Sequence, residues 1–323
     1  MSAFPSLLFR RAADKAVHRS RRHAKAQHLA LALSPLMLPL LSLPAHAHAV
    51  AGDRIFPATL GIDDPSVASE VSLPTVAWAP APVDANGNVP KQTDIGGELD
   101  LLLLPNFALG ISNGWSSQVA KNEEGAFGFN NWEVSAKYKF FEDDEHETLM
   151  SVGLVADIGG TGAQGIGADS TSTLTPTFYF GKGMGDLPDS MALLKPFAVT
   201  GTLGFSWAQN RSEPDAISPG LSVQYSMQYL KTAVKDYDLP EFVNHLIPLV
   251  EVPLSLNVDH GSSTWGGTVN PGVIYLANTW QFGVEAMIPV SGGTQHGTGV
   301  IGQFHVFLDD WLPSFAQPLL GAS

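Results

Sequence analysis

Apolar and polar side chains alternate along segments of about ten residues, and turns or loops separate these segments. In the segment 132–140, for example, Trp132 and Val134 alternate with Glu133 and Ser135. Because successive side chains of a strand point to opposite faces, each segment has one apolar face and one polar face. The pattern predicts about twelve strands, within a range of about 10 to 14. These strands are expected near residues 70–79, 94–104, 106–113, 129–141, 147–158, 172–181, 194–207, 220–232, 248–259, 268–277, 280–289 and 298–308.

The length of these segments indicates which kind of sheet they form. A tilted strand needs about 9–11 residues to cross the hydrocarbon core of a membrane. Closing the sheet pairs every backbone group in a region where no water is available to do so. We therefore predict an all-β fold, a closed antiparallel transmembrane β-barrel with short periplasmic turns and longer external loops. A soluble β-sandwich produces the same alternation and stays an alternative.

The connections between the expected strands mostly alternate in length, as they do in outer-membrane barrels. Short turns are expected at 142–146 and 278–279. Longer external loops are expected at 80–93, 114–128, 159–171 and 208–219. Two connections on the periplasmic side, 182–193 and 233–247, are too long for this rule, and the second is expected to contain a helical turn.

The beginning of the chain has the features of a secretory signal peptide. A basic stretch is followed by an apolar stretch at 29–43 and by alternating alanines, so cleavage is expected after Ala49 or Ala47. The expected organisation is a signal peptide at 1–49, a periplasmic or plug-like N-terminal segment without regular strands at 50–71, the barrel at 72–308 and a C-terminal tail at 309–323.

The charge of the remaining chain limits its partners. Seven of the 17 Lys and Arg residues and one of the 31 acidic residues belong to the expected signal peptide, so the rest carries a net charge of −20. This charge argues against binding nucleic acid and against electrostatic attraction to anionic lipid. The chain contains no cysteine, which excludes disulfides and thiolate chemistry.

The polar faces of the strands carry the candidate site residues, because inside a barrel such groups pair with one another or contact water. We expect the following side chains to line the lumen: Glu98, Asp100, Glu133, Lys137, Lys139, Asp157, Gln224, Gln228, Glu251, Asn257, Gln281, Glu285, Gln303 and His305. This lining is acidic on balance. A barrel of about twelve strands is narrow compared with 16-stranded porins, so a lumen plugged by these groups and by 50–71 stays an alternative to an open one.

Four stretches of the chain are distinctive: the segment 53–65, with the sequence DRIFPATLGIDDP, the segment 73–76, the segment 270–275 and the closing segment 304–310. They resemble a family of bacterial outer-membrane β-barrel transporters that is similar to the outer-membrane proteins of the meta-pathway of phenol degradation. The resemblance implies passage of small hydrophobic or aromatic molecules and brings no catalytic residues with it. Many outer-membrane barrels end in an aromatic residue, whereas here a tail follows Phe307.

Motifs that carry chemistry are weak in this chain. The stretch 84–88 resembles the start of a calcium loop, but Val89 and Ile95 stand where Gly and Glu are needed. The Gly-rich stretch 159–167 lacks the Lys and Ser or Thr of a phosphate loop. The histidines after the leader are scattered, and no motif links a serine nucleophile to a base. We therefore predict no enzyme, no cofactor and no metal site.

The sequence as a whole predicts an exported outer-membrane protein that lets small solutes pass passively. Its expected partners are outer-membrane lipid and lipopolysaccharide, the barrel-assembly machinery and a small-molecule solute. A structural or adhesive barrel without an open pore and a soluble periplasmic β-sandwich binding protein are the alternatives.

Overall fold

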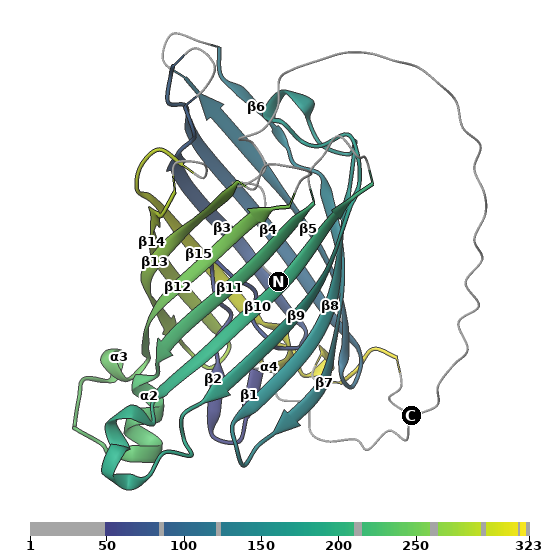
Figure 1. Ribbon diagram of the computed structural model, residues 1–323. Coiled ribbons are helices and arrows are strands. Elements are labelled where there is room, and N and C mark those ends of the chain that lie inside the picture. Colours follow the sequence, from purple (N-terminus) through teal and green to yellow (C-terminus); the bar gives the residue numbers. More distant parts are fainter. Residues whose placement is uncertain are drawn as a thin grey trace.

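Long antiparallel strands form the body of the protein in the computed structural model, which describes residues 49–83, 87–120, 124–209, 215–258, 264–291, 295–315 and 317–320. Each long strand pairs with the next along the chain, and β15 pairs with β3, so the sheet closes into a barrel (Figure 1). The twelve barrel strands among these residues are β3 (Glu70–Pro80), β4 (Lys91–Leu104), β5 (Phe107–Val119), β7 (Trp132–Asp143), β8 (Thr148–Ile158), β9 (Thr173–Gly183), β10 (Phe197–Ala208), β11 (Ala216–Tyr225), β12 (Leu246–Asn257), β13 (Trp265–Leu276), β14 (Trp280–Pro289) and β15 (Gly299–Phe307). The predicted closed antiparallel β-barrel is confirmed, and the β-sandwich alternative is wrong.

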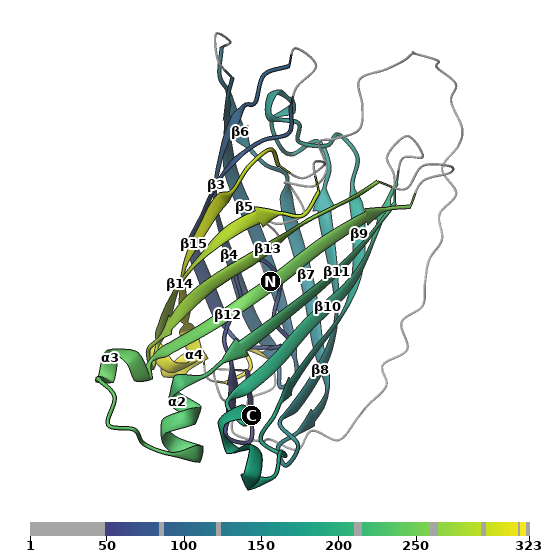
Figure 2. The ribbon, with the colours of Figure 1, turned by 60° about the vertical axis from the view of Figure 1, so that its left-hand side comes forward.

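The two ends of the barrel differ in their connections. The terminal end, as we call it, carries the start of β3, the end of β15 and most of the short helices, while β6 lies at the opposite, loop end (Figures 1 and 2). The helices after the loop-end helix η1 (Gln164–Ile166) are η2 (Asp189–Leu194), α2 (Met227–Tyr229), η3 (Leu230–Val234), α3 (Glu241–Asn244), α4 (Leu308–Trp311) and η4 (Pro313–Phe315). Helix α3 is the helical turn expected within 233–247. No helix among the described residues is long and apolar enough to cross a membrane.

Two strand ends differ from those expected by more than five residues. Strand β5 continues to Val119, and β6 (Ala126–Phe129) pairs with its last part, so most of the expected loop 114–128 is sheet. Strand β11 ends at Tyr225 instead of continuing to residue 232. The reason is a helix cap, because the Ser226 hydroxyl accepts a hydrogen bond of 3.1 Å from the Tyr229 amide and starts α2.

The start of the described chain also contains strands that the sequence did not predict. Strands β1 (Ala49–Ala51) and β2 (Arg54–Phe56) form a short hairpin near the terminal end (Figure 1). Its turn includes Gly52 at a φ of 60°, a conformation that costs glycine little. The expectation of an N-terminal segment without regular strands is therefore wrong for these residues. Apart from Ala49, the expected signal peptide lies outside the described residues.

The segment that follows the last strand folds back on the barrel. Leu319 and Leu320 donate backbone hydrogen bonds of 3.0 and 2.9 Å to the carbonyl groups of Leu102 and Leu103 at the end of β4. The tail after β15 thus covers backbone acceptors at the terminal end.

The strands alternate between an apolar outward face and an inward face that is polar over much of the barrel. On β10, Leu203 is 53% exposed on the outer surface, whereas Thr200 on the inward face is fully buried. Apolar side chains on the outside of a closed barrel match the hydrocarbon core of a bilayer. The outward face therefore fits a lipid environment, and the inward face holds the groups that need polar partners.

Replacing Leu203 by Arg tests this assignment. Near the middle of a strand, an outward arginine is expected to lower the free energy of unfolding by about 2–4 kcal/mol, because its charge must enter hydrocarbon. The measurement is urea unfolding in liposomes, followed by tryptophan fluorescence. The matched control is Phe127→Arg, at a side chain that is 70% exposed on β6 at the loop end, where the cost is expected to be small. Equal costs at both positions would contradict the assignment.

Candidate functional site

The chain between the β1–β2 hairpin and β3 runs through the barrel interior. We call residues 57–69 the inner segment. They form no strand or helix, and most of their side chains are buried. Three hydrogen bonds join them to different parts of the wall: the Gly61 amide donates to the Glu251 carboxylate, the Gln281 side chain donates to the carbonyl of Ala58, and the Ser151 hydroxyl donates to the carbonyl of Pro65. The inner segment therefore fills interior space between β8 and the β12–β14 side.

Lys137 on β7 holds the inner segment through its ammonium group. Its Nζ atom lies 3.0 Å from Oδ1 of Asp63, 2.9 Å from the carbonyl oxygen of Asp64 and 4.7 Å from the ring centroid of Tyr179. The lysine is only 3% exposed, so its charge depends on these partners. Because an unpaired buried charge is costly, this contact favours the observed position of the inner segment.

Gly61 approaches the wall more closely than any residue with a side chain could without displacing its neighbours. A Cβ atom at this position would lie 2.5 Å from Oε2 of Glu251 and 2.8 Å from Nδ2 of Asn270. Glu251 on β12 and Glu285 on β14 flank this part of β13, because Glu251 pairs opposite Asn270 and Glu285 pairs opposite Gly272. Both carboxyl groups are buried in the wall, where their oxygens can accept hydrogen bonds. The Gly61 amide donates a hydrogen bond to one of them, the Glu251 carboxylate.

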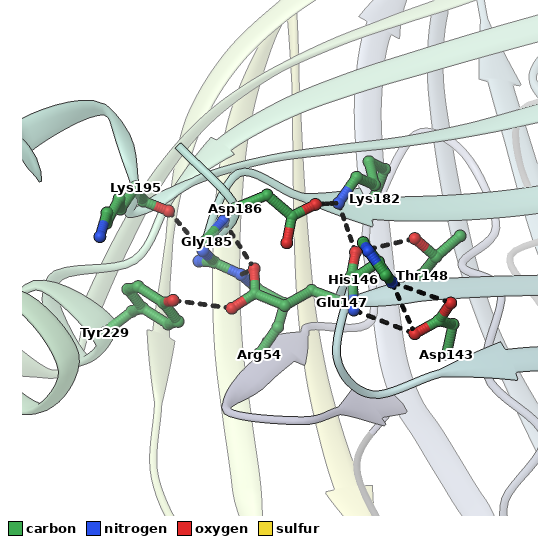
Figure 3. Close-up of polar contacts among 10 residues, drawn as sticks. All are labelled: Arg54, Asp143, His146, Glu147, Thr148, Lys182, Gly185, Asp186, Lys195 and Tyr229. Atoms are coloured by element: carbon green, nitrogen blue, oxygen red, sulfur yellow. Dashed lines mark hydrogen bonds and ion pairs between the residues drawn. The ribbon is translucent and has the colours of Figure 1, made fainter. Parts of the chain in front are cut away.

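A second contact region, which we call the Arg54 cluster, fixes the β1–β2 hairpin at the terminal end (Figure 3). The Arg54 guanidinium group lies 3.2 Å from Oε2 of Glu147 and donates to the carbonyl groups of Pro196 and Lys195 at 3.0 and 2.5 Å. It also lies 3.7 Å from the ring centroid of Tyr229. Charge-assisted hydrogen bonds of this kind are among the strongest in proteins, so the hairpin is held firmly.

Glu147 connects the Arg54 cluster to the neighbouring turns. Its carboxylate accepts hydrogen bonds from the Tyr229 hydroxyl at 2.7 Å and from the Gly185 amide at 3.1 Å (Figure 3). Burial and the hydrogen bond to Glu147 raise the pKa of the Tyr229 hydroxyl to about 12, so this hydroxyl stays a donor at neutral pH. The hairpin gains one more contact, because the Gly52 amide donates to Oδ1 of Asp144 at 2.9 Å. Three connections of the chain, β7–β8, β9–β10 and β11–β12, thus meet around one arginine.

One part of the inward wall is apolar. Leu60 of the inner segment packs into a buried cluster with side chains of β3 and β12–β15. The wall members of this cluster are Ala77, Ala79, Ile247, Leu249, Ile274, Leu276, Met287, Ile301 and Phe307. The interior therefore offers an apolar surface beside the polar groups that hold the inner segment.

Polar contacts also line the junction where β15 meets β3. Nε2 of His305 lies 3.3 Å from Oε2 of Glu70, and Nδ1 lies 2.8 Å from the Ser72 hydroxyl. Just beyond β15, Oδ1 of Asp309 accepts a hydrogen bond of 3.0 Å from the Ser69 amide. Burial and the nearby charge of Glu70 raise the pKa of Asp309 to about 7.

The structure places the sequence-predicted residues in three settings. Ten are buried on inward faces: Asp100, Glu133, Lys137, Asp157, Gln224, Glu251, Gln281, Glu285, Gln303 and His305. Three more belong to the same alternation but are partly exposed: Glu98, Lys139, whose Nζ atom pairs with Glu142, and Asn257, whose side chain donates to Thr264. Gln228 is different, because it lies on α2 outside the barrel wall, and its prediction as a strand residue is wrong.

Sequence analysis missed several residues that hold the interior together. Asp94 faces inward and accepts hydrogen bonds from Gln92 and Ser116. The expected strand 94–104 already contained Asp94 on the same face as Glu98 and Asp100, and a strand begun at residue 91 would have added Gln92 to that face. Arg54 and Asp63 gave no periodic signal, because they lie before the first barrel strand. Within the described ranges, no group of three or more His, Cys, Asp or Glu side chains is arranged to hold a metal ion.

Replacing Gly61 by Ala tests how the inner segment is held. The added Cβ atom collides with Glu251 and Asn270, so we expect a loss of about 1–3 kcal/mol of unfolding free energy and faster amide exchange in 57–69. Hydrogen exchange with mass spectrometry measures the second effect. Gly165→Ala is the control, because a Cβ atom there meets nothing within 4 Å. Unchanged exchange in the Gly61 variant would show that the contact does not position the segment.

Replacing Asp309 by Asn tests the buried carboxyl group at the terminal end. A folded-state pKa above the unfolded value gives stability below pH 4 that is lost as the pH rises to about 7. The loss is a few kcal/mol at most, at about 1.4 kcal/mol per pH unit. Asparagine keeps the Oδ1 acceptor and does not ionise, so its variant is expected to lack this slope and to be more stable at pH 8. Urea unfolding from pH 4 to pH 8 measures the difference, and parallel curves would contradict the prediction.

Comparisons with known proteins find similarities among solved structures. No family model and no curated protein sequence matches the chain. Among solved structures, the chain is similar to an outer-membrane channel from Pseudomonas putida F1, with 12% identity, a TM-score of 0.48 and coverage of 75% of this chain and 96% of that one. It is also similar to the KdgM porin, with 11% identity, a TM-score of 0.40 and coverage of 73% and 98%. A third similarity is to the translocator domain of the autotransporter NalP from Neisseria meningitidis, with 9% identity, a TM-score of 0.42 and coverage of 76% and 89%. All three TM-scores lie below 0.5, so these similarities assign neither a family nor a function to this chain.

Proposed function

We propose that this protein is a passive transporter of the bacterial outer membrane whose lumen is closed at rest by the inner segment. The observation that carries the proposal is the apolar wall of β3 and β12–β15, on which Leu60 packs. When the inner segment moves away, this wall is left for a solute. A barrel that serves only as a water-filled pore has no need of such a surface, because porin interiors are polar.

The contacts divide the N-terminal region into a hairpin held by one dense cluster and an inner segment held by scattered contacts. The β1–β2 hairpin is anchored by the Arg54 cluster. The inner segment instead makes separate contacts with several strands, two of them with Lys137, and forms no strand along its backbone. Displacement of the inner segment therefore breaks a few separate hydrogen bonds and the Lys137 ion pair, while the hairpin keeps its place.

The composition of the interior suggests which solutes pass. The apolar wall fits small hydrophobic or aromatic molecules, in line with the family that the sequence resembles. The inward faces also carry more acidic than basic groups, so ions that pass should be mainly cations. The buried acidic groups of the wall are Glu70, Asp94, Asp100, Glu133, Asp157, Glu251 and Glu285. In this proposal the exported chain is assembled into the outer membrane by the barrel-assembly machinery and is surrounded by lipid and lipopolysaccharide.

A structural barrel without a pore is the second candidate, and the firmness of the Arg54 cluster favours it. A buried arginine with an ion pair, two carbonyl acceptors and a stacked ring resists displacement. If the inner segment is equally immobile, the interior is a filled core. The two candidates differ in whether the inner segment moves. A disulfide between the inner segment and the wall can block this motion.

The double variant Ile62→Cys with Gly220→Cys can form this disulfide, and the chain has no other cysteine that could compete for it. A Cβ atom at Gly220 on β11 would lie 3.2 Å from Cβ of Ile62, close to the separation of about 3.5–4.5 Å in disulfides. In planar bilayers with a KCl gradient, we expect the oxidised variant to be silent and the reduced variant to open with cation preference. Cells that produce the variant should admit the apolar dye N-phenyl-1-naphthylamine only after addition of reductant.

Each single-cysteine variant serves as a control, because it introduces one substitution but cannot form the disulfide within the chain. Both single variants should behave alike with and without reductant. Equal conductance of the oxidised and reduced double variant would show that solutes do not depend on movement of the inner segment. A correctly folded barrel that is silent in every state would favour the structural candidate.

A further inference from the structure

The connection between β11 and β12 projects from the terminal end and carries exposed apolar side chains. We call residues 235–244 the foot. Within it, Phe242 is 64% exposed, Tyr237 is 46% exposed and Leu239 is 36% exposed. Figures 1 and 2 show α2 and α3 beside the terminal ends of the strands, outside the barrel. Soluble surfaces rarely gather large apolar groups in this way, so the foot needs a partner.

Side-chain contacts hold the foot in a defined conformation. Nζ of Lys231 lies 2.9 Å from Oε2 of Glu241, and the Asn244 side chain donates to the carbonyl of Leu239 at 3.2 Å. Nδ1 of His245 lies 2.6 Å from the carbonyl oxygen of Leu276, which fastens the end of the foot to β13. These contacts hold the exposed side chains in fixed positions.

The position of Phe242 indicates what covers it. Its ring stacks on Tyr275 with centroids 5.3 Å apart, Tyr275 stacks on Trp280 at 5.5 Å, and Trp280 lies 5.6 Å from Phe304. Tyr275, Trp280 and Phe304 alternate with the inward residues of β13, β14 and β15, so they belong to the outward face. Phe242 therefore extends an aromatic row of the lipid-facing surface beyond the ends of the strands. Such rows lie at the boundary between headgroups and acyl chains.

The charges in and beside the foot do not favour binding to anionic lipid headgroups. They agree with a foot that contacts lipid through its apolar side chains. Lys231 and Lys235 stand beside Asp236, Asp238 and Glu241, so the balance is slightly negative. The Lys235 ammonium group lies 5.0 Å from the ring centroid of Tyr237, in the manner of interfacial side chains that keep an amine in water above an aromatic ring.

We infer that the foot lies in the membrane interface at the terminal end, with Phe242, Tyr237 and Leu239 inserted among the lipids beside the barrel. It thereby widens the bilayer contact of the barrel on one side and fixes the depth of β12 and β13. In an outer membrane with the terminal end towards the periplasm, these lipids are the phospholipids of the inner leaflet.

The absence of cysteine makes a direct depth measurement possible. Phe242→Cys carries a nitroxide label in liposomes of phosphatidylethanolamine and phosphatidylglycerol, and its collisions with oxygen and with a water-soluble nickel chelate are measured. Leu203→Cys marks the hydrocarbon core. Ala233→Cys, at an exposed residue of η3 outside the aromatic row, marks water. Heat-modifiable gel mobility verifies that every labelled variant is folded.

We expect the ratio of oxygen to nickel accessibility at Phe242 to be several-fold higher than at Ala233 and lower than at Leu203. A ratio equal to that at Ala233 would place the foot in water and overturn the inference. Protection from both reagents would also overturn it, because a protein surface, such as a second copy, would then cover the foot. Neither result depends on whether the inner segment moves.

Discussion

Closure of the sheet is the constraint on which the rest of this structure depends. Inside hydrocarbon no water pairs with a free backbone group, so β15 must pair with β3. This last pairing is irregular, because its register shifts between Gln303 and His305, and the adjacent β3–β4 pairing shifts between Ser72 and Thr75. Polar contacts of His305 with Glu70 and Ser72 reinforce the junction from the inside.

A closed barrel of this size creates an interior that side chains and the inner segment must fill together. The polar groups on the inward faces would lose stability if they were buried without partners. The inner segment supplies such partners, including Asp63 for Lys137 and the Gly61 amide for Glu251. The same segment covers the apolar wall with Leu60. In the function proposed above, stability of the closed barrel and obstruction of its lumen are thus two consequences of one set of contacts.

The contacts that the barrel makes with its surroundings depend on the same division between an inward and an outward face. Aromatic side chains on the outward face continue from the strands into the connection between β11 and β12. The helix cap at Ser226 ends β11 early and releases the chain for this connection. A local hydrogen bond at Ser226 thus accompanies the structured extension that joins β11 to β12 at the terminal end, in place of a short turn.

The sequence by itself determined the twelve strands, the closed barrel and the inward face of most polar residues, because alternation with period two is a local property of the chain. It predicted neither the β1–β2 hairpin nor the end of β11 at Tyr225, where turn and cap geometry decides. Only the tertiary structure joined Arg54 to Glu147 and Asp63 to Lys137. Such pairs lie far apart in the sequence and have no periodicity, so they arise only when the barrel has closed around the inner segment.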